Sequence, residues 1–163
     1  MTAKNTTVSL RIKQHVILVD ADDWARLCNL AWHVIESGSG HLYVAHSISS
    51  KVGHISMHRM ILSAPKNLMI DHINGNGLDN RKENLRLATN AQNQYNRRKT
   101  HGVSSSKFKG VSFTRARGRW AAQIRVQKRL IWLGYYQTEE EAALAYNAGA
   151  IKHYGAFAKL NPV

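Results

Sequence analysis

The chain has 163 residues, enough for one ordinary domain or for two small domains with modest cores. Its 23 lysines and arginines against 10 aspartates and glutamates give a net charge of +13, and this excess favours a polyanionic partner. The only cysteine, Cys28, excludes an intrachain disulfide and a cysteine-rich zinc cluster, and it suits a reducing cytoplasm.

Residues 1–56 are expected to form a β-rich scaffold around one helix. The runs VSLRI, HVILV and HLYVAHSI predict strands, and DADDWARLCNLAW predicts a helix with Asp20 as its N-cap. VILV is too short for a signal peptide or a membrane span, so we expect a soluble cytoplasmic protein that does not enter membranes. The histidines of this segment show no spacing that pairs them as metal ligands.

The segment MIDHINGNGLDNRKENLRLATNAQN, residues 69–93, carries strand, loop, strand and helix signals in that order. LMI runs into Asp71 and His72, the Gly- and Asn-rich stretch favours a tight reversal, and NLRLAT predicts a second strand. TNAQ supplies a capping box for a helix that begins at Asn90, which puts Asn93 in the second turn. Neighbouring residues of a regular strand point to opposite faces, so Asp71 and His72 can serve one metal only if the strand ends or bulges there.

These side chains have the chemistry of phosphodiester hydrolysis. The carboxylate of Asp71 and the amide oxygen of Asn93 suit a hydrated divalent cation such as Mg²⁺, and a neutral His72 can take a proton from an attacking water. Arg97 or Arg98 would lie nearby to hold a phosphate. The alternative is an Asn-rich hairpin whose amides satisfy the loop backbone, with Asp71 and His72 as an ordinary surface pair.

The run MHRMILSAPKNLMIDHINGNGLDNRKENLRLATNAQNQYNRR resembles the HNH endonuclease family, in the branch with Asp-His first and Asn last. The resemblance implies a ββα-metal core over residues 57–98, with His72 as general base and with Asp71 and Asn93 as metal ligands. Where many relatives carry a terminal histidine this sequence has Asn93, which favours Mg²⁺ or Mn²⁺ over zinc.

The same resemblance assigns supporting roles. Asn84 matches the central asparagine that braces the loop, and Asn80 is the competing choice for that brace. His58 and Arg59 match an upstream His-Arg pair, for which we expect a packing or phosphate role rather than catalysis.

A linker is expected at residues 99–106, where charge, Gly and Ser replace any hydrophobic period, followed by a domain over residues 107–163. There GRWAAQIRV and LIWLGYY predict strands around a turn at QKR, within a three-stranded antiparallel sheet. Thr138 and Glu141 form a capping box for a helix that lies on the sheet and stops at Gly155.

The free face of this sheet is expected to enter the major groove of double-stranded DNA. The arginines expected on that face are Arg115, Arg117, Arg119, Arg125 and Arg129. The alternative is a basic but inert surface.

Residues 106–161 resemble the plant APETALA/ethylene-response-factor DNA-binding domain through KGV, GRWAAQIR, WLGYYQTEEEAALAYNAGAIKHYG and AKLN. The positions that carry over as DNA-binding are Lys109, Arg119, Trp120, Gln123, Arg125 and Trp132. Ser112 and Thr114 stand where the plant pattern has arginines, which weakens the expectation of a GC-rich target.

Together these features predict an α+β protein with a nuclease core and a small sheet-and-helix domain. The combination resembles freestanding homing endonucleases of phages and bacterial mobile elements, acting in the cytoplasm of a bacterial or phage-infected cell. One HNH site per chain favours nicking by a monomer. Two other functions stay open, a non-catalytic sequence-specific DNA-binding regulator and an RNA-binding protein.

Overall fold

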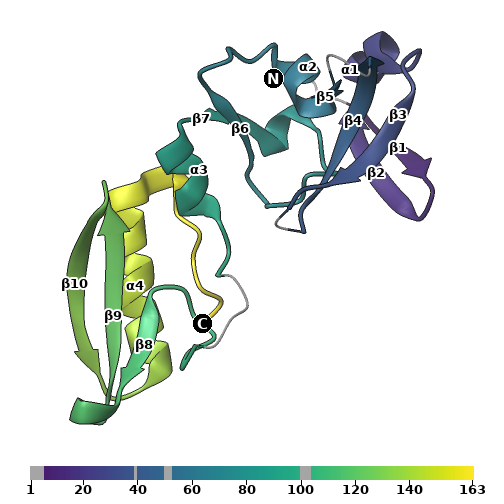
Figure 1. Ribbon diagram of the computed structural model, residues 1–163. Coiled ribbons are helices and arrows are strands. Elements are labelled where there is room, and N and C mark those ends of the chain that lie inside the picture. The colour runs from purple at the N-terminus through teal and green to yellow at the C-terminus, as the bar shows by residue number, and fades with distance from the viewer. Residues whose placement is uncertain (1–5, 39, 50–52, 100–103) are drawn as a thin grey trace. The chain divides into compact units, whose positions relative to one another are not determined.

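The computed structural model describes residues 6–38, 40–49, 53–99 and 104–163. Part of the expected linker, residues 100–103, lies outside this range. The chain divides into two compact units, Met1–Asn90 and Ala91–Val163. Both mix helices with small antiparallel sheets (Figure 1). No helix within the described residues is long and apolar enough to cross a membrane.

The first unit begins with a hairpin of β1 (Thr7–Ile12) and β2 (His15–Asp20) that leads into α1 (Ala21–Leu27). Asp20 occupies the predicted N-cap position, but its side chain makes no cap hydrogen bond. Its carboxylate instead accepts the main-chain N–H of Lys82 at 2.9 Å. The helix is shorter than predicted because the chain turns at Cys28, where the indole of Trp32 donates to the carbonyl of Leu27.

A second sheet of the first unit has the order β3 (Trp32–Glu36), β4 (Leu42–Ser49) and β5 (Gly53–Ser56), followed by α2 (Met57–Leu62). Of these elements the sequence predicted only β4, because the others are short and have weak periodicity. They help to enclose the core of this unit, whose buried members are Ile17, Val19, Leu27, Val44, Met57, Ile61, Ile70, Leu78 and Leu85.

The predicted strand, loop and strand follow as β6 (Met69–His72), a loop that ends in the 3-10 turn η1 (Lys82–Asn84), and β7 (Leu85–Ala88). The two strands pair antiparallel from Met69 opposite Ala88 to His72 opposite Leu85. Helix α3 (Asn90–Asn96) begins at the predicted residue. Its residues from Ala91 onward group with the second unit.

The second unit contains the predicted three-stranded sheet, in the order β10 (Arg129–Tyr136), β9 (Arg119–Val126) and β8 (Val111–Thr114). Helix α4 (Glu139–Tyr154) packs along one face of this sheet (Figure 1). The Thr138–Glu141 capping box is confirmed. The main-chain N–H of Thr138 donates to Glu141 Oε2 at 3.1 Å, and the main-chain N–H of Glu141 donates to Thr138 Oγ1 at 3.2 Å.

Small residues allow the close approach of α4 to the sheet. The buried residues of this core are Phe108, Val111, Ala122, Ile124, Ala142, Ala143, Tyr146 and Ala150. Gly110 has φ +74°, and a Cβ at this position would lie 2.1 Å from the ring of Tyr146. Only glycine satisfies both conditions. Gly155 follows α4 at φ +54° and begins η3 (Gly155–Phe157), which confirms the predicted stop.

Candidate active site and DNA-binding surface

Asp71 lies in β6 directly opposite Arg86 of β7, and the two form a buried ion pair. Arg86 Nε and Nη2 donate to Asp71 Oδ2 at 2.7 and 2.6 Å, and the Asp71 side chain is 5% exposed. Two charged donors on one carboxylate oxygen hold that oxygen in place and limit the orientations open to the carboxylate. Arg86 was not predicted as a site residue, although the register of the two predicted strands would have placed it opposite Asp71.

His72 is the last residue of β6, where the strand ends as required for the two neighbours to serve one site. His72 is 6% exposed, and its Nε2 lies 3.5 Å from Oδ1 of the fully buried Asn80. Burial lowers the pKa of His72 below its ordinary value of 6.5, while the contact with Asn80 and the charges of Asp71 and Asp79 oppose that shift. Burial of both Asp71 and His72 contradicts the surface-pair alternative.

An aromatic cluster surrounds the His72 ring. The ring of His58, from α2, meets it edge-on with centroids 5.0 Å apart, and the ring of Tyr43, from β4, lies 6.0 Å away. Nδ1 of His58 is buried and has no hydrogen-bond partner among the described residues. Burial, then the charges of His72 and Arg59, lower the pKa of His58 to about 3, so this imidazole is neutral at physiological pH. The sequence did not predict Tyr43 as a site residue, because it lies in the segment that was expected to be scaffold.

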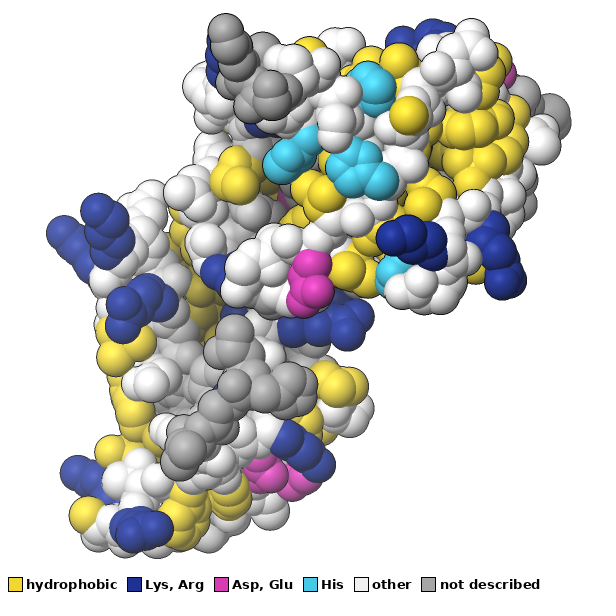
Figure 2. Space-filling model, turned by 45° about the vertical axis from the view of Figure 1, so that its right-hand side comes forward, with side chains coloured by type: hydrophobic (Ala, Val, Ile, Leu, Met, Phe, Trp, Pro, Cys, Tyr) yellow, Lys and Arg dark blue, Asp and Glu magenta, His cyan; other side chains and the backbone are white. Residues whose placement is uncertain are grey.

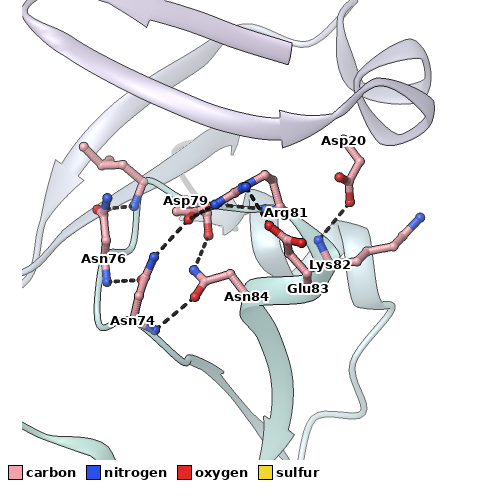
Figure 3. Close-up of polar contacts among 9 residues, drawn as sticks. Asp20, Asn74, Asn76, Asp79, Arg81, Lys82, Glu83 and Asn84 are labelled. Atoms are coloured by element: carbon pink, nitrogen blue, oxygen red, sulfur yellow. Dashed lines mark hydrogen bonds and ion pairs between the residues drawn. The ribbon is translucent and has the colours of Figure 1, made fainter. Parts of the chain in front are cut away.

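The loop between β6 and β7 is held by asparagine and aspartate side chains (Figure 3). Asn84 Oδ1 accepts the N–H of Asn74 at 3.0 Å, while its Nδ2 donates to the carbonyl of Asp79 at 2.8 Å. The Asp79 carboxylate accepts from Asn74 Nδ2 and from two guanidinium nitrogens of Arg81. These contacts make Asn84 the side chain that bridges the loop, whereas Asn80 contacts His72.

The same loop is tied to the N-terminal scaffold. Asn80 N–H donates to the carbonyl of Leu18 at 2.7 Å, and Leu18 N–H donates to the carbonyl of Leu78 at 3.0 Å. The main-chain contact of Lys82 with Asp20 and an ion pair between Lys82 Nζ and Asp23 at 2.9 Å lie beside them. Strand β2 and the start of α1 therefore support the loop that follows Asp71 and His72.

Arg59 was predicted to have either a packing or a phosphate role. Its guanidinium donates to the carbonyls of Ala64, Pro65 and Leu68, at 3.3, 3.4 and 2.6 Å. These bonds fasten the turn between α2 and β6, as a packing role requires, and the phosphate role stays a prediction.

Asn93, Arg97 and Arg98 belong to the second unit. Asn93 is half-buried in α3, and both arginines are exposed beyond its C-terminal end. Arg97 Nη1 donates to Gln94 Oε1 at 3.0 Å. The assignment of Asn93 as a ligand and of the arginines as phosphate contacts stays a prediction.

The face of the C-terminal sheet opposite α4 carries part of the predicted DNA-binding set. Arg119 and Arg125 are exposed on β9, with Gln123 between them, and Trp132 of β10 pairs with Gln123. On the face of the molecule drawn in Figure 2, lysine and arginine side chains are spread widely, with few acidic ones among them. A basic surface of this kind suits the phosphates of a nucleic acid.

The remaining predicted residues differ in position. Arg115 and Arg117 belong to η2 (Arg115–Arg117), between β8 and β9, and the Arg117 guanidinium lies over the ring of Tyr135 at 4.8 Å. Tyr135 pairs with Ala121, on the same face of the sheet as Arg119 and Gln123, so Arg117 reaches the predicted face. Arg129 pairs with Val126, which packs against the core, so its Cβ is on the α4 side of the sheet, contrary to prediction. Trp120 also packs against this core.

Lys109, a predicted DNA contact, is bonded within its own domain, and its DNA-binding role stays a prediction. Its Nζ donates to the carbonyls of Tyr95 and Arg97, both at 2.7 Å. Burial, followed by the charges of Lys159 and Arg97, lowers the pKa of Lys109 to about 8. The ammonium therefore binds the end of α3.

The donors available for a metal are hard oxygens. In the described part of the chain, no group of three or more His, Cys, Asp or Glu side chains could hold a metal ion. A carboxylate oriented by Arg86 and an asparagine amide fit Mg²⁺, which keeps several waters and takes further oxygens from a phosphate substrate.

Family models match two parts of the chain, an HNH endonuclease over residues 63–95 and an AP2 domain over residues 106–156. The uncharacterized HNH endonuclease L560 of Acanthamoeba polyphaga mimivirus is 30% identical over 151 residues, which cover 89% of this chain and 74% of that protein. Dehydration-responsive element-binding protein 2D of Arabidopsis thaliana is 47% identical over 60 residues, 36% of this chain and 29% of the plant protein. An AP2-like ethylene-responsive transcription factor of the same plant is 45% identical over 69 residues, 40% of this chain and 20% of its own length.

Proposed function

Because the chain belongs to the HNH endonuclease family and carries a C-terminal AP2 DNA-binding domain, we propose that it is a metal-dependent, nicking, homing-type endonuclease of double-stranded DNA. The observation that carries this proposal is the buried pair of Asp71 and His72 at the end of β6, inside the segment matched by the HNH model. Two buried ionisable neighbours, one oriented by an arginine and one in an aromatic cluster, are typical of a reactive site.

His72 acts as the general base in this proposal. Its lowered pKa keeps the imidazole neutral at pH 7, as a proton acceptor requires. We assign the hydrogen to Nε2, which lies 3.5 Å from the acceptor Asn80 Oδ1, and the proton of the attacking water to Nδ1. In this assignment Asn80 favours the tautomer that the reaction needs.

Asp71 and Asn93 are the ligands that we propose for the divalent cation, Mg²⁺ or Mn²⁺. When bound, this ion supplies positive charge to the phosphoryl and leaving oxygens of the scissile phosphodiester. Arg86 limits the orientations open to the Asp71 carboxylate, and Arg97 or Arg98 contacts a neighbouring phosphate.

The C-terminal sheet supplies affinity for the duplex in this proposal. Arg119, Arg125 and Gln123 present guanidinium and amide groups on the same face of β9, and such groups can bond both base edges and phosphates. Trp132 adds an aromatic surface beside Gln123. The second candidate, a non-catalytic DNA-binding regulator, is favoured by this surface but leaves the buried Asp71–His72 pair without a function.

The test is cleavage of supercoiled plasmid by the full chain in Mg²⁺ or in EDTA. We expect nicked circles in Mg²⁺ and no product in EDTA, because the chemistry needs the cation. His72→Ala should abolish cleavage and keep DNA affinity, whereas the matched variant of an exposed histidine, His54→Ala, should keep both. Binding without cleavage by the wild-type chain would favour the regulator, and preference for RNA over duplex DNA would favour an RNA-binding protein.

A further inference from the structure

Helix α3 is fastened to the AP2 domain by a tyrosine stack. The rings of Tyr95 in α3 and Tyr154 at the end of α4 lie parallel, with centroids 3.8 Å apart and planes 9° from each other. The Tyr154 hydroxyl donates to the carbonyl of Arg125 at 2.6 Å. One side chain of α4 therefore contacts both α3 and β9, the strand that carries the arginines of the DNA-binding surface.

Lys109 holds the same helix at its C-terminal end. Its ammonium donates to the carbonyls of Tyr95 and Arg97, which the helix itself leaves without partners. The main-chain N–H of Lys109 donates to the side-chain oxygen of Asn161, and the side-chain amide of Asn161 donates back to the carbonyl of Lys109. The main chain of Asn161 makes the same pair of bonds with the side chain of Asn147 in α4. The cation at the end of α3 is therefore anchored to the main helix of the AP2 domain.

A second lysine adds to this attachment. Lys99 Nζ donates to Ser104 Oγ and to the carbonyls of Ser106 and Phe108, at 2.6 to 2.9 Å. The residues that follow α3 are thus bonded to the segment that enters β8. Within the second unit, α3 is therefore held in three ways. The ring of Tyr154 stacks on it, Lys109 binds carbonyls at its C-terminal end, and Lys99 bonds the residues after it to the segment before β8.

This attachment fixes the direction in which Asn93 points. Successive residues of an α-helix are turned by about 100°, so Asn93 and Tyr95 are about 200° apart around the axis. With Tyr95 packed on Tyr154, Asn93 projects from the face of α3 turned away from that contact. The proposed ligand and the contact with α4 are therefore on opposite sides of α3.

We propose that the AP2 domain positions the nuclease helix, with Tyr95, Tyr154 and Lys109 as positioning residues for Asn93. This inference rests on the function proposed above, in which Asn93 is a metal ligand. Such a role differs from DNA binding, because it makes the geometry of the metal site depend on side chains that contact no substrate. The path from Arg125 through Tyr154 to Tyr95 also connects the DNA-reading strand to the helix that carries the ligand.

The test compares the full chain with Tyr95→Ala, Tyr95→Phe and Lys109→Met. Three quantities are measured: the Mg²⁺ concentration for half-maximal nicking, the affinity for Mn²⁺ by calorimetry with bound DNA, and the affinity for DNA in EDTA. Tyr95→Ala and Lys109→Met should lower the nicking rate and weaken Mn²⁺ binding by about tenfold or more, because a small displacement of a ligand is costly. DNA affinity in EDTA should stay within about twofold, since neither side chain is on the face of β9 that carries Arg119 and Arg125.

Tyr95→Phe keeps the stacked ring and should behave as wild type. Phe113→Ala is the matched control, because it removes an aromatic pair with Trp120 in the same domain and does not touch α3. Wild-type metal affinity and nicking in Tyr95→Ala and Lys109→Met would overturn the inference, as would equal losses of DNA and metal affinity. Failure of the wild-type chain to nick DNA would instead contradict the proposed nuclease function, and the Mn²⁺ affinities would still decide whether Tyr95 and Lys109 position a ligand.

Discussion

Replacing His58 with phenylalanine should make the protein less sensitive to acid. The pKa of His58 is lowered to about 3 from an ordinary value of 6.5, chiefly by burial. The unfolded chain therefore binds a proton at this site more tightly than the folded protein does. By linkage, the stability associated with neutral His58 is fully present above pH 6.5 and is lost progressively as the pH falls toward 3.

The size of the effect follows from the two pKa values. Relative to pH 8, His58 should reduce the free energy of unfolding by about 1 kcal/mol at pH 5.5 and by about 3 kcal/mol at pH 4.5. Phenylalanine keeps an aromatic ring beside His72 and Tyr43 and removes Nδ1, a buried atom with no hydrogen-bond partner among the described residues. His58→Phe should therefore fold, and its stability should fall less steeply in acid than that of the wild type.

The assay is urea unfolding of both chains at pH 8, 5.5 and 4.5, with the exposed His54→Gln as control. The difference in unfolding free energy between wild type and His58→Phe should change by the stated amounts, whereas His54→Gln should follow the wild type. Parallel pH curves for wild type and His58→Phe would refute the reasoning. An NMR titration in which the His58 ring takes up its proton near pH 6.5 would refute it independently.

Two further changes test the packing of the site and the sheet. Arg86→Met should lower the free energy of unfolding by about 3 kcal/mol at pH 7, because it leaves the Asp71 carboxylate buried without its cation; a loss below about 1 kcal/mol in urea unfolding would contradict this. Replacing Gln127 and Lys128, at φ +47° and +68°, with Asn-Gly should stabilise the β9–β10 turn by about 1 to 2 kcal/mol, since a two-residue turn with both φ positive prefers these residues. An unchanged or lower midpoint of thermal unfolding would count against that assignment.

Local signals in the sequence were sufficient for the elements that carry the candidate site. The apolar run before Asp71, the Asn-Gly stretch and the TNAQ sequence correctly predicted β6, the reversal and the start of α3. The capping box at Thr138 did the same for α4. In each case the determining residues lie within a few positions of the feature, so tertiary contacts are not needed to find it.

Side-chain partners depended on information that local patterns lack. Asp71 meets Arg86 because the register of β6 and β7 places them opposite each other, and a shift of one residue would have removed the pair. Arg129 was assigned to the wrong side of the sheet because a two-residue turn makes Val126 and Arg129 directly opposed neighbours. Counting the alternation through the turn as if it were one strand gives the opposite side.

Lys109 shows that a basic sequence does not identify the protein partners of an individual lysine. Its charge and its place in the KGV motif both favour a DNA contact, yet its ammonium is bonded to the carbonyls of Tyr95 and Arg97. Those carbonyls lie 14 and 12 residues away, beyond the range of any local rule. Burial lowers the pKa of Lys109 to about 8, which accords with an ammonium packed against these carbonyls.

The place of α3 changes what a deletion experiment on this protein can show. Removing all residues after Thr100 would delete Tyr154 and Lys109, and with them the ring and the cation that hold α3 within the second unit. Loss of cleavage in such a truncated chain would therefore not measure the contribution of DNA affinity alone, because the helix carrying the proposed ligand would also lose its support. Point substitutions on β9, such as Arg119→Ala, change the DNA-binding face while leaving α3 attached. Only changes of this second kind can separate DNA binding from the geometry of the nuclease site.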